Sequence, residues 1–315
     1  MEKLLEIKKL NLFFGEHQAL YDVSLSLEKG KMHALAGESG CGKTMTAMSV
    51  IRLLPKSAVI KSGEVIFKGE NLLYYNEKQM RELRGNKIAL IPQDPMTSLN
   101  PLYTIGNQLV ESIRAHAKVS YNQAMRKAKE VLNMVKMPDV NNKLKSYPHE
   151  LSGGMKQKVI IAMALATNAE LIIADEPTTA LDVTIQKQIM DLLDEIKKEI
   201  GTTVLLISHD LALVSNYADN ISVMYAGHVV EEAEADEFFK NPLHPYSKAL
   251  LNSLPTRNQM LRLKTIEGTP PSIQEKIDGC KFHPRCTLCV SNICTTKQPM
   301  LKEKTLNHYS SCLIF

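Results

Sequence analysis

Residues 37–44 read Gly37-Glu38-Ser39-Gly40-Cys41-Gly42-Lys43-Thr44, and they match the phosphate-binding pattern G-x-x-x-x-G-K-[ST]. An apolar, strand-like run at 32–36 precedes this loop, and a helix-like run at 46–54 follows it. The glycines let successive backbone N–H groups point into one hollow, and the start of the helix adds positive potential. Lys43 can reach the outer phosphates, and Thr44 can hold Mg²⁺. The loop therefore predicts a site for a nucleoside triphosphate.

Cys41 lies inside this loop, beside Ser39, Gly40 and Gly42, and we expect these residues to contact phosphate. The main contribution of Cys41 is expected to be its backbone N–H. A helix start lowers the pKa of a nearby thiol. Cys41 is therefore predicted to react readily with alkylating reagents and to be protected by bound ATP.

Length and composition restrict the class of protein. The chain has 315 residues, of which 44% are hydrophobic, and this favours one large domain with an appendage. The 38 basic and 34 acidic residues nearly balance, without a basic block, so nucleic acid is not expected as a partner. No apolar stretch approaches the roughly 20 residues that span a bilayer, and the first residues lack the features of a signal peptide. We expect the protein to be made and kept in the cytosol.

Strand-like runs lie at 64–67 and 88–91, and continuous apolar runs lie at 171–174 and 204–207. The continuous runs indicate a mostly parallel sheet covered by helices. Between residues 100 and 151 the pattern becomes helical. It includes a capping box at Ser120 and Gln123, followed by apolar residues at helical spacing. A helical insertion is therefore expected in the sheet. Beyond about residue 255 the periodicity fades, which predicts a second unit.

Two carboxylates, Asp175 and Glu176, directly follow the apolar run 171–174, at the edge where parallel sheets bind ligands. Asp175 is expected to bind Mg²⁺, and Glu176 to polarise the attacking water. His209 ends the next strand in the same way and is expected near the γ-phosphate. A capping role for the Asp-Glu pair is the structural alternative.

The segment Leu151-Ser152-Gly153-Gly154-Met155-Lys156-Gln157 precedes a predicted helix at 158–166. Its two glycines let the backbone approach an anion closely, and the helix start supplies unpaired N–H groups. Ser152, Gly153 and Gly154 therefore predict a second phosphate-recognition element in the same chain.

Together with Ala180-Leu181-Asp182, these motifs resemble those of the ATP-binding subunits of ABC transporters, over residues 5–255. The resemblance implies that Ser152–Gly154 of one subunit completes the ATP site of another, so we expect the chain to act as half of a dimer. It also implies that Gln93 senses the γ-phosphate and binds Mg²⁺ with Thr44 and Asp175. Phe14 is expected to stack on adenine, and one of the adjoining Phe13 and Phe14 is expected to belong to the core.

The implied enzyme is an ATPase that converts ATP and water to ADP and phosphate. Lys43 and Mg²⁺ neutralise charge, Glu176 is the base, and His209 and Gln93 orient the reacting groups. The implied fold is an α/β P-loop NTPase with a mostly parallel core sheet, an antiparallel β subdomain and a helical subdomain at about 96–165. The ATP-binding domain is expected at 1–255, and a small Cys-rich C-terminal extension at 256–315.

The segments 93–101, 147–151, 244–251 and 268–272 resemble those of dipeptide, oligopeptide and nickel importers. This resemblance implies an ATPase that energises import of di- or oligopeptides from the cytoplasmic side of the cell membrane, bound there peripherally. Its implied partners are a homologous ATP-binding subunit, expected to be a paralogue, two integral membrane permease subunits and an extracytoplasmic substrate-binding protein. Import of nickel or another metal complex is the close alternative. A soluble ABC ATPase or a metal-sensing module is less consistent with these motifs, and the cargo itself is not encoded in recognisable residues.

Five of the six cysteines lie near the C-terminus, at positions 280, 286, 289, 294 and 312. In a cytosolic protein such clustering indicates metal more often than disulfides. Resemblance to the peptide importers implies an iron–sulfur cluster on Cys280, Cys286, Cys294 and Cys312, with Cys289 as a further candidate. Four thiolates suit [4Fe–4S] or Zn²⁺, and free thiols are the remaining alternative.

Overall fold

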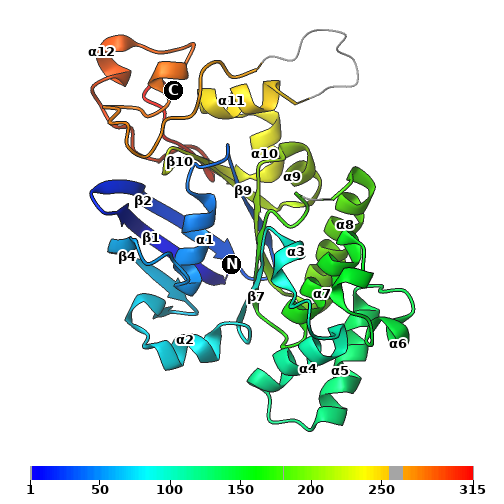
Figure 1. Cartoon of the computed structure of the whole chain (residues 1–315). Coiled ribbons are helices and arrows are strands. Elements are labelled where there is room, and N and C mark those ends of the chain that lie inside the picture. The colour runs from blue at the N-terminus through cyan, green and yellow to red at the C-terminus, as the bar shows by residue number, and fades with distance from the viewer. Residues whose placement is uncertain (1, 180, 255–264, 315) are drawn as a thin grey trace. The chain divides into compact units, whose positions relative to one another are not determined.

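The computed structural model describes residues 2–179, 181–254 and 265–314 (Figure 1). The chain divides into two compact units: Met1–Leu73 with Leu206–Phe315, called unit 1, and Tyr74–Leu205, called unit 2. The predicted boundary between the ATP-binding domain and the extension, at residue 255, lies outside the described residues.

Unit 1 contains an antiparallel sheet of four strands in the order β2-β1-β4-β5. Apolar side chains of β1, among them Leu5, Ile7, Leu10 and Leu12, are buried, while its lysines are exposed. This one-sided burial is typical of antiparallel sheets, and the sheet is the antiparallel β subdomain that the sequence predicts. The strands are β1 (Lys3–Phe14), β2 (His17–Glu28), β4 (Ala58–Phe67) and β5 (Glu70–Asn71).

The other strands of unit 1 are ordered β11-β12-β10-β9-β3, with β3 parallel to β9 and the remaining neighbours antiparallel. All five residues of β3 are buried, as expected for a strand covered on both faces. The strands are β3 (Met32–Ala36), β9 (Asn220–Tyr225), β10 (His228–Glu234), β11 (Lys302–Thr305) and β12 (His308–Ser310). β8 (Thr203–Ser208) has residues in both units.

The C-terminal segment therefore adds two strands to this sheet of unit 1, and in Figure 1 it lies against β10 and α11. The helices of unit 1 are α1 (Lys43–Ile51), α9 (Leu211–Tyr217), α10 (Ala235–Lys240), α11 (Pro245–Asn252), the 3-10 turn η3 (His283–Arg285) and α12 (Ser291–Cys294). α1 ends at Ile51, three residues before the end of the predicted helical run, because Arg52 adopts a left-handed conformation.

Unit 2 contains a parallel strand pair, β6 (Ile88–Ile91) and β7 (Leu171–Asp175), and most of the helices. The predicted capping box is present: Ser120 Oγ accepts from Gln123 N–H, and Gln123 Oε1 accepts from Ser120 N–H. The predicted helical insertion is thus confirmed. The helices are α2 (Glu77–Leu83), α3 (Pro95–Ser98), α4 (Ile105–His116), α5 (Tyr121–Met134), α6 (Val140–Lys143), α7 (Gly153–Leu165) and α8 (Val183–Ile200), and the 3-10 turns are η1 (Leu72–Tyr74), which begins in unit 1, and η2 (Pro148–Glu150).

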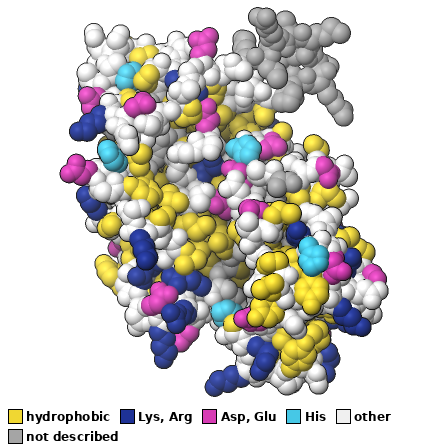
Figure 2. Space-filling model, in the orientation of Figure 1, with side chains coloured by type: hydrophobic (Ala, Val, Ile, Leu, Met, Phe, Trp, Pro, Cys, Tyr) yellow, Lys and Arg dark blue, Asp and Glu magenta, His cyan; other side chains and the backbone are white. Residues whose placement is uncertain are grey.

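No helix within the described residues is both long and apolar enough to cross a membrane. On the face shown in Figure 2, basic and acidic side chains are interspersed, which agrees with the small net charge.

His33 is a buried titratable group at the centre of unit 1. It lies in β3 with 2% of its surface exposed, and its Nε2 is 2.9 Å from Ser222 Oγ of β9. Burial lowers the pKa of His33 to about 4. Since an unfolded histidine has a pKa of about 6.5, the folded state favours the neutral ring and loses stability as the pH falls through this range.

We predict that replacing His33 with Gln weakens the pH dependence of stability. Between pH 7 and pH 5 the native chain should lose about 2 kcal/mol more unfolding free energy than H33Q, because only the native unfolded state gains a proton at this position. Urea unfolding at both pH values measures the difference. Parallel losses in the two proteins would contradict the assignment.

Candidate functional site

Three glycines shape the phosphate loop in unit 1. Gly37, Gly40 and Gly42 all have positive φ, at 147°, 79° and 109°. A Cβ atom on Gly37 would lie 2.3 Å from the carbonyl oxygen of Met224, and one on Gly42 would lie 2.7 Å from the Leu20 side chain. Only glycine fits these two positions, because the loop packs directly on neighbouring strands.

Lys43 begins α1 at the end of this loop. Gly42 precedes the helix and has no side chain to cap it, so the first N–H groups of the helix face the loop side. Lys43 is 4% exposed, and its ammonium donates to the carbonyl oxygens of Gly37 at 2.8 Å and Glu38 at 2.9 Å. Positive charge is therefore concentrated inside the loop, next to the first turn of the helix, which also contains Thr44.

Cys41 differs from its predicted behaviour. Its side chain is 5% exposed, and burial raises the pKa of the thiol, an effect that the nearby Lys43 only partly offsets. The prediction of a readily alkylated thiol with a lowered pKa is therefore wrong. Desolvation of a buried thiolate outweighs the helix start in this position.

Two residues of the C-terminal region contact the loop, and no sequence motif predicts either contact. The Tyr246 hydroxyl accepts a hydrogen bond from the N–H of Glu38 at 2.9 Å. The Arg285 guanidinium donates to both carboxylate oxygens of Glu38, at 2.7 and 3.0 Å. The segments that contain Tyr246 and Arg285 therefore pack next to the phosphate loop.

His209 and Phe14 also lie in unit 1. His209 is exposed and directly follows β8, in a turn where Ser208 Oγ accepts from the N–H of Asp210. Phe14 and Phe13 are both half-buried, so the expectation that one of them belongs to the core is wrong. Phe13 lies under the Lys61 ammonium, which is 3.9 Å from the ring centroid.

The two predicted carboxylates lie in unit 2 at the end of β7. Asp175 is the last, buried residue of the strand, and Glu176 follows with a φ of 46°. Glu176 Oε2 accepts from Gln93 Nε2 at 2.9 Å and from Thr179 Oγ1 at 2.9 Å. The structure thus brings Glu176 and Gln93 together, 83 positions apart, and adds Thr179, which the sequence did not identify.

The Ser152 segment also lies in unit 2, at the start of α7. This helix begins at Gly153 rather than at the predicted residue 158, because exposed Ser152 caps it by accepting from the N–H of Met155. A Cβ on Gly154 would lie 2.7 Å from Ile185 of α8, so this glycine is required for packing. The two glycines are inside the helix start, where free N–H groups gather.

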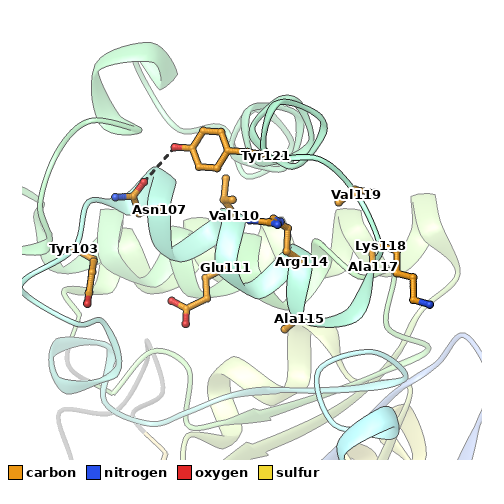
Figure 3. Close-up of a pocket in the computed structure, with 10 residues that line it drawn as sticks. All are labelled: Tyr103, Asn107, Val110, Glu111, Arg114, Ala115, Ala117, Lys118, Val119 and Tyr121. Atoms are coloured by element: carbon orange, nitrogen blue, oxygen red, sulfur yellow. Dashed lines mark hydrogen bonds between the residues drawn. The ribbon is translucent and has the colours of Figure 1, made fainter.

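An open hollow of about 740 Å³ lies along α4 in unit 2 (Figure 3). The hydroxyl of Tyr121 donates to Asn107 Oδ1 at 3.3 Å across one side. Nearby side chains of Leu102 and Tyr103 are 80% and 53% exposed. The lining residues are Tyr103, Asn107, Val110, Glu111, Arg114, Ala115, Ala117, Lys118, Val119 and Tyr121.

Four of the C-terminal cysteines line one small cavity in unit 1: Cys280, Cys286, Cys294 and Cys312. Burial raises the pKa of Cys280 to about 11, and its three neighbouring thiols contribute to the rise. Among the described residues, Cys289 does not line this cavity, and no group of three or more His, Cys, Asp or Glu side chains is placed to hold a metal ion. The four thiols therefore gather as predicted, but not as a preformed metal site.

Comparison with known proteins identifies the family. Residues 20–179 match the family model described as ABC transporter, and residues 230–294 match the one described as oligopeptide/dipeptide transporter, C-terminal region. The chain is 48% identical to the probable peptide ABC transporter ATP-binding protein y4tR of Sinorhizobium fredii, over 98% of this chain and 94% of that protein. It is 43% identical to the oligopeptide transport ATP-binding protein OppD of Bacillus subtilis, over 99% of this chain and 89% of that protein.

Solved structures agree with this match. The chain resembles the dimeric post-hydrolysis state of the ATP-binding cassette MJ0796 bound to ADP and Pi, with a TM-score of 0.66 and 27% identity over 74% of this chain and 99% of that one. It also resembles cbiO1 from Clostridium perfringens, with a TM-score of 0.67 and 25% identity over 76% of this chain and 92% of that one. The predicted α/β P-loop fold is confirmed. The chain belongs to the ABC transporter family, and it carries the C-terminal region of the oligopeptide/dipeptide transporters.

Proposed function

We propose that this chain hydrolyses ATP to energise the import of di- or oligopeptides through an ABC transporter, at the cytoplasmic side of the cell membrane. The observation that carries the proposal is the Glu176 carboxylate, held by Gln93 and Thr179 directly after β7. The names of the relatives and the C-terminal region at 230–294 favour peptide over the alternative of nickel or another metal complex.

In the proposed site, loop residues from Ser39 to Thr44 bind the phosphates, and Phe14 stacks on adenine. Thr44, Gln93 and Asp175 would hold Mg²⁺, which neutralises phosphate charge when bound. Water attacks the γ-phosphorus while the bond to the β-phosphate oxygen breaks, and Glu176 takes the proton from the water. Lys43, Gln93 and His209 orient and stabilise the transferring group. The two hydrogen bonds to the Glu176 carboxylate support its role, since a base must be positioned before it can act.

We predict that replacing Glu176 with Gln keeps ATP binding and lowers turnover by at least about 100-fold, because the amide cannot accept the proton. Phosphate release and ATP titration measure the two effects separately. Glu170→Gln is the matched control: Glu170 pairs with Lys87 in the same unit, and turnover should persist. Turnover within a few-fold of native in E176Q would contradict the role of Glu176.

We further propose that two ATP molecules are sandwiched between this chain and a homologous subunit, a paralogue. Ser152, Gly153 and Gly154 would cover the partner's nucleotide, and the exposed Ser152 at the start of α7 supports this. Two permease subunits and an extracytoplasmic substrate-binding protein complete the proposed transporter. The ATP-binding domain is assigned to 1–255, with its helical subdomain at about 96–165, and the extension to 256–315.

The hollow in Figure 3 is the proposed contact for a permease subunit. Its support is the exposure of Leu102 and Tyr103, since large exposed apolar side chains in a group mark interaction surfaces. A peripheral attachment to the membrane follows from this contact.

We predict that Tyr103→Asp reduces copurification with integral membrane subunits by about tenfold or more, because a buried charge in an interface is costly. ATP binding by the isolated chain should be unaffected. The control is Tyr74→Asp, which alters an aromatic residue that is 85% exposed in η1 of the same unit. Equal copurification of both variants and the native chain would reject this surface.

The four cysteines that line one cavity are proposed to bind a [4Fe–4S] cluster. The fit rests on the donor set, because four thiolates are the usual ligands of such a cluster. A single Zn²⁺ needs its sulfur ligands about 2.3 Å from one centre, and the described residues offer no such group. Zn²⁺ on the same four thiolates is the alternative, and metal analysis of the purified protein separates the two.

We predict that protein purified without oxygen contains about four iron atoms and four sulfides per chain. Cys294→Ser should remove most of both, since one of the four ligands is lost. Cys289→Ser is the matched control and should keep them, because Cys289 does not line the cavity among the described residues. Zinc alone, or no metal, in the native protein would reject the cluster.

A further inference from the structure

Glu38 is the only acidic residue in the sequence 37–44. Its N–H, its carbonyl oxygen and its carboxylate all form hydrogen bonds. Its N–H donates to the Tyr246 hydroxyl, and its carbonyl oxygen accepts from the Lys43 ammonium. Its carboxylate accepts two hydrogen bonds from Arg285. Every one of these residues belongs to unit 1. The position of Glu38 is therefore set largely by the C-terminal region.

Arg285 is well suited to hold a carboxylate. Its side chain is 6% exposed, whereas that of Glu38 is 25% exposed. Besides Glu38, it donates from Nε to the carbonyl oxygen of Glu267 at 3.0 Å and from Nη1 to the Tyr225 hydroxyl at 3.3 Å. Hydrogen bonding to Glu38 raises the pKa of the guanidinium further above its usual range. Because other hydrogen bonds already orient its planar guanidinium, Arg285 loses little conformational freedom when it forms a bidentate pair with Glu38.

An unpaired carboxylate in this loop would oppose phosphate binding. A nucleoside triphosphate brings several negative charges to the loop, and like charges at close range in a partly buried site repel strongly. The guanidinium cancels this repulsion. It also fixes the backbone of Glu38, whose carbonyl oxygen is one of the two acceptors that hold the Lys43 ammonium.

We propose that Arg285 is a positioning residue for the phosphate loop: it neutralises and fixes Glu38, and the C-terminal extension thereby sets the affinity of the chain for ATP. The proposal rests on the assignment of residues 37–44 as the phosphate site. It gives the extension a role in nucleotide binding through Arg285, which directly precedes Cys286 in the sequence.

Calorimetric titration of the full chain with Mg-ATP tests this role. Arg285→Ala should raise the dissociation constant by about tenfold, the usual scale for a charged hydrogen-bonded pair. Arg285→Lys keeps the charge but not the fork, so it should weaken binding by a smaller factor. Lys302→Ala removes one exposed positive charge from the same extension and should bind like the native chain.

The double variant E38Q/R285A separates positioning from packing. If Arg285 acts through Glu38, removing both charges should restore binding to within about threefold of E38Q alone, and rising salt should reduce the defect of R285A. The double variant has no unpaired carboxylate, so it remains informative if R285A fails to fold. Native-like binding by R285A, or binding by E38Q/R285A that is tenfold weaker than by E38Q, would overturn the proposal.

Lys43→Ala tests the underlying assignment separately. It should abolish detectable ATP binding if residues 37–44 hold the phosphates. If K43A loses ATP binding while R285A binds ATP like the native chain, only the role of Arg285 is rejected. Full binding in K43A would reject the phosphate site itself.

Discussion

The confinement of the Lys43 ammonium within a tight backbone loop is the constraint on which the rest of unit 1 depends. The loop curves closely enough for two of its carbonyl oxygens to bind that ammonium. It reaches this curvature by packing Gly37 against the Met224 carbonyl of β9 and Gly42 against Leu20 of β2. A Cβ atom at either glycine would push the loop away from these strands. Strands of both sheets of unit 1 therefore act as a rigid support for the chemistry of the loop.

The C-terminal extension is part of the same support. Its strand β12 pairs with β10, and the buried Glu231 of β10 accepts from His308 Nε2 at 2.8 Å. Glu231 also accepts from the N–H groups of Leu243 and His244, each at 2.7 Å. One buried carboxylate thus joins the extension to the segment that begins α11, whose Tyr246 reaches the phosphate loop. His244, which also lines the cysteine cavity, therefore lies in the same hydrogen-bonded group as Glu231.

The sequence predicted what depends on local patterns. The phosphate loop, the capping box at Ser120 and the strand before Asp175 each follow from short-range spacing, and the structure contains all three. The family and the fold class followed from several such motifs in order, and comparison confirmed both. The assigned roles of Glu176, His209 and the Ser152 segment stay predictions.

Contacts between segments that lie far apart in the chain could not be predicted from local sequence patterns. Arg285 and Tyr246 meet Glu38 across 247 and 208 positions, and no local pattern encodes such a pair. The reactivity predicted for Cys41 was wrong for a related reason, because its burial depends on tertiary packing that a helix-start rule does not include. The sequence predicts a start of α7 that is too late, because its glycines suggest a flexible approach to phosphate, whereas Gly154 makes room for Ile185.

A structure of the chain with Mg-ATP is the most direct test of the central claim that residues 37–44 hold the triphosphate. The account predicts that the Lys43 ammonium leaves the carbonyl oxygens of Gly37 and Glu38 and contacts the outer phosphates, while Arg285 stays paired with Glu38. A nucleotide bound elsewhere, with Lys43 still bonded to both carbonyl oxygens, would contradict it.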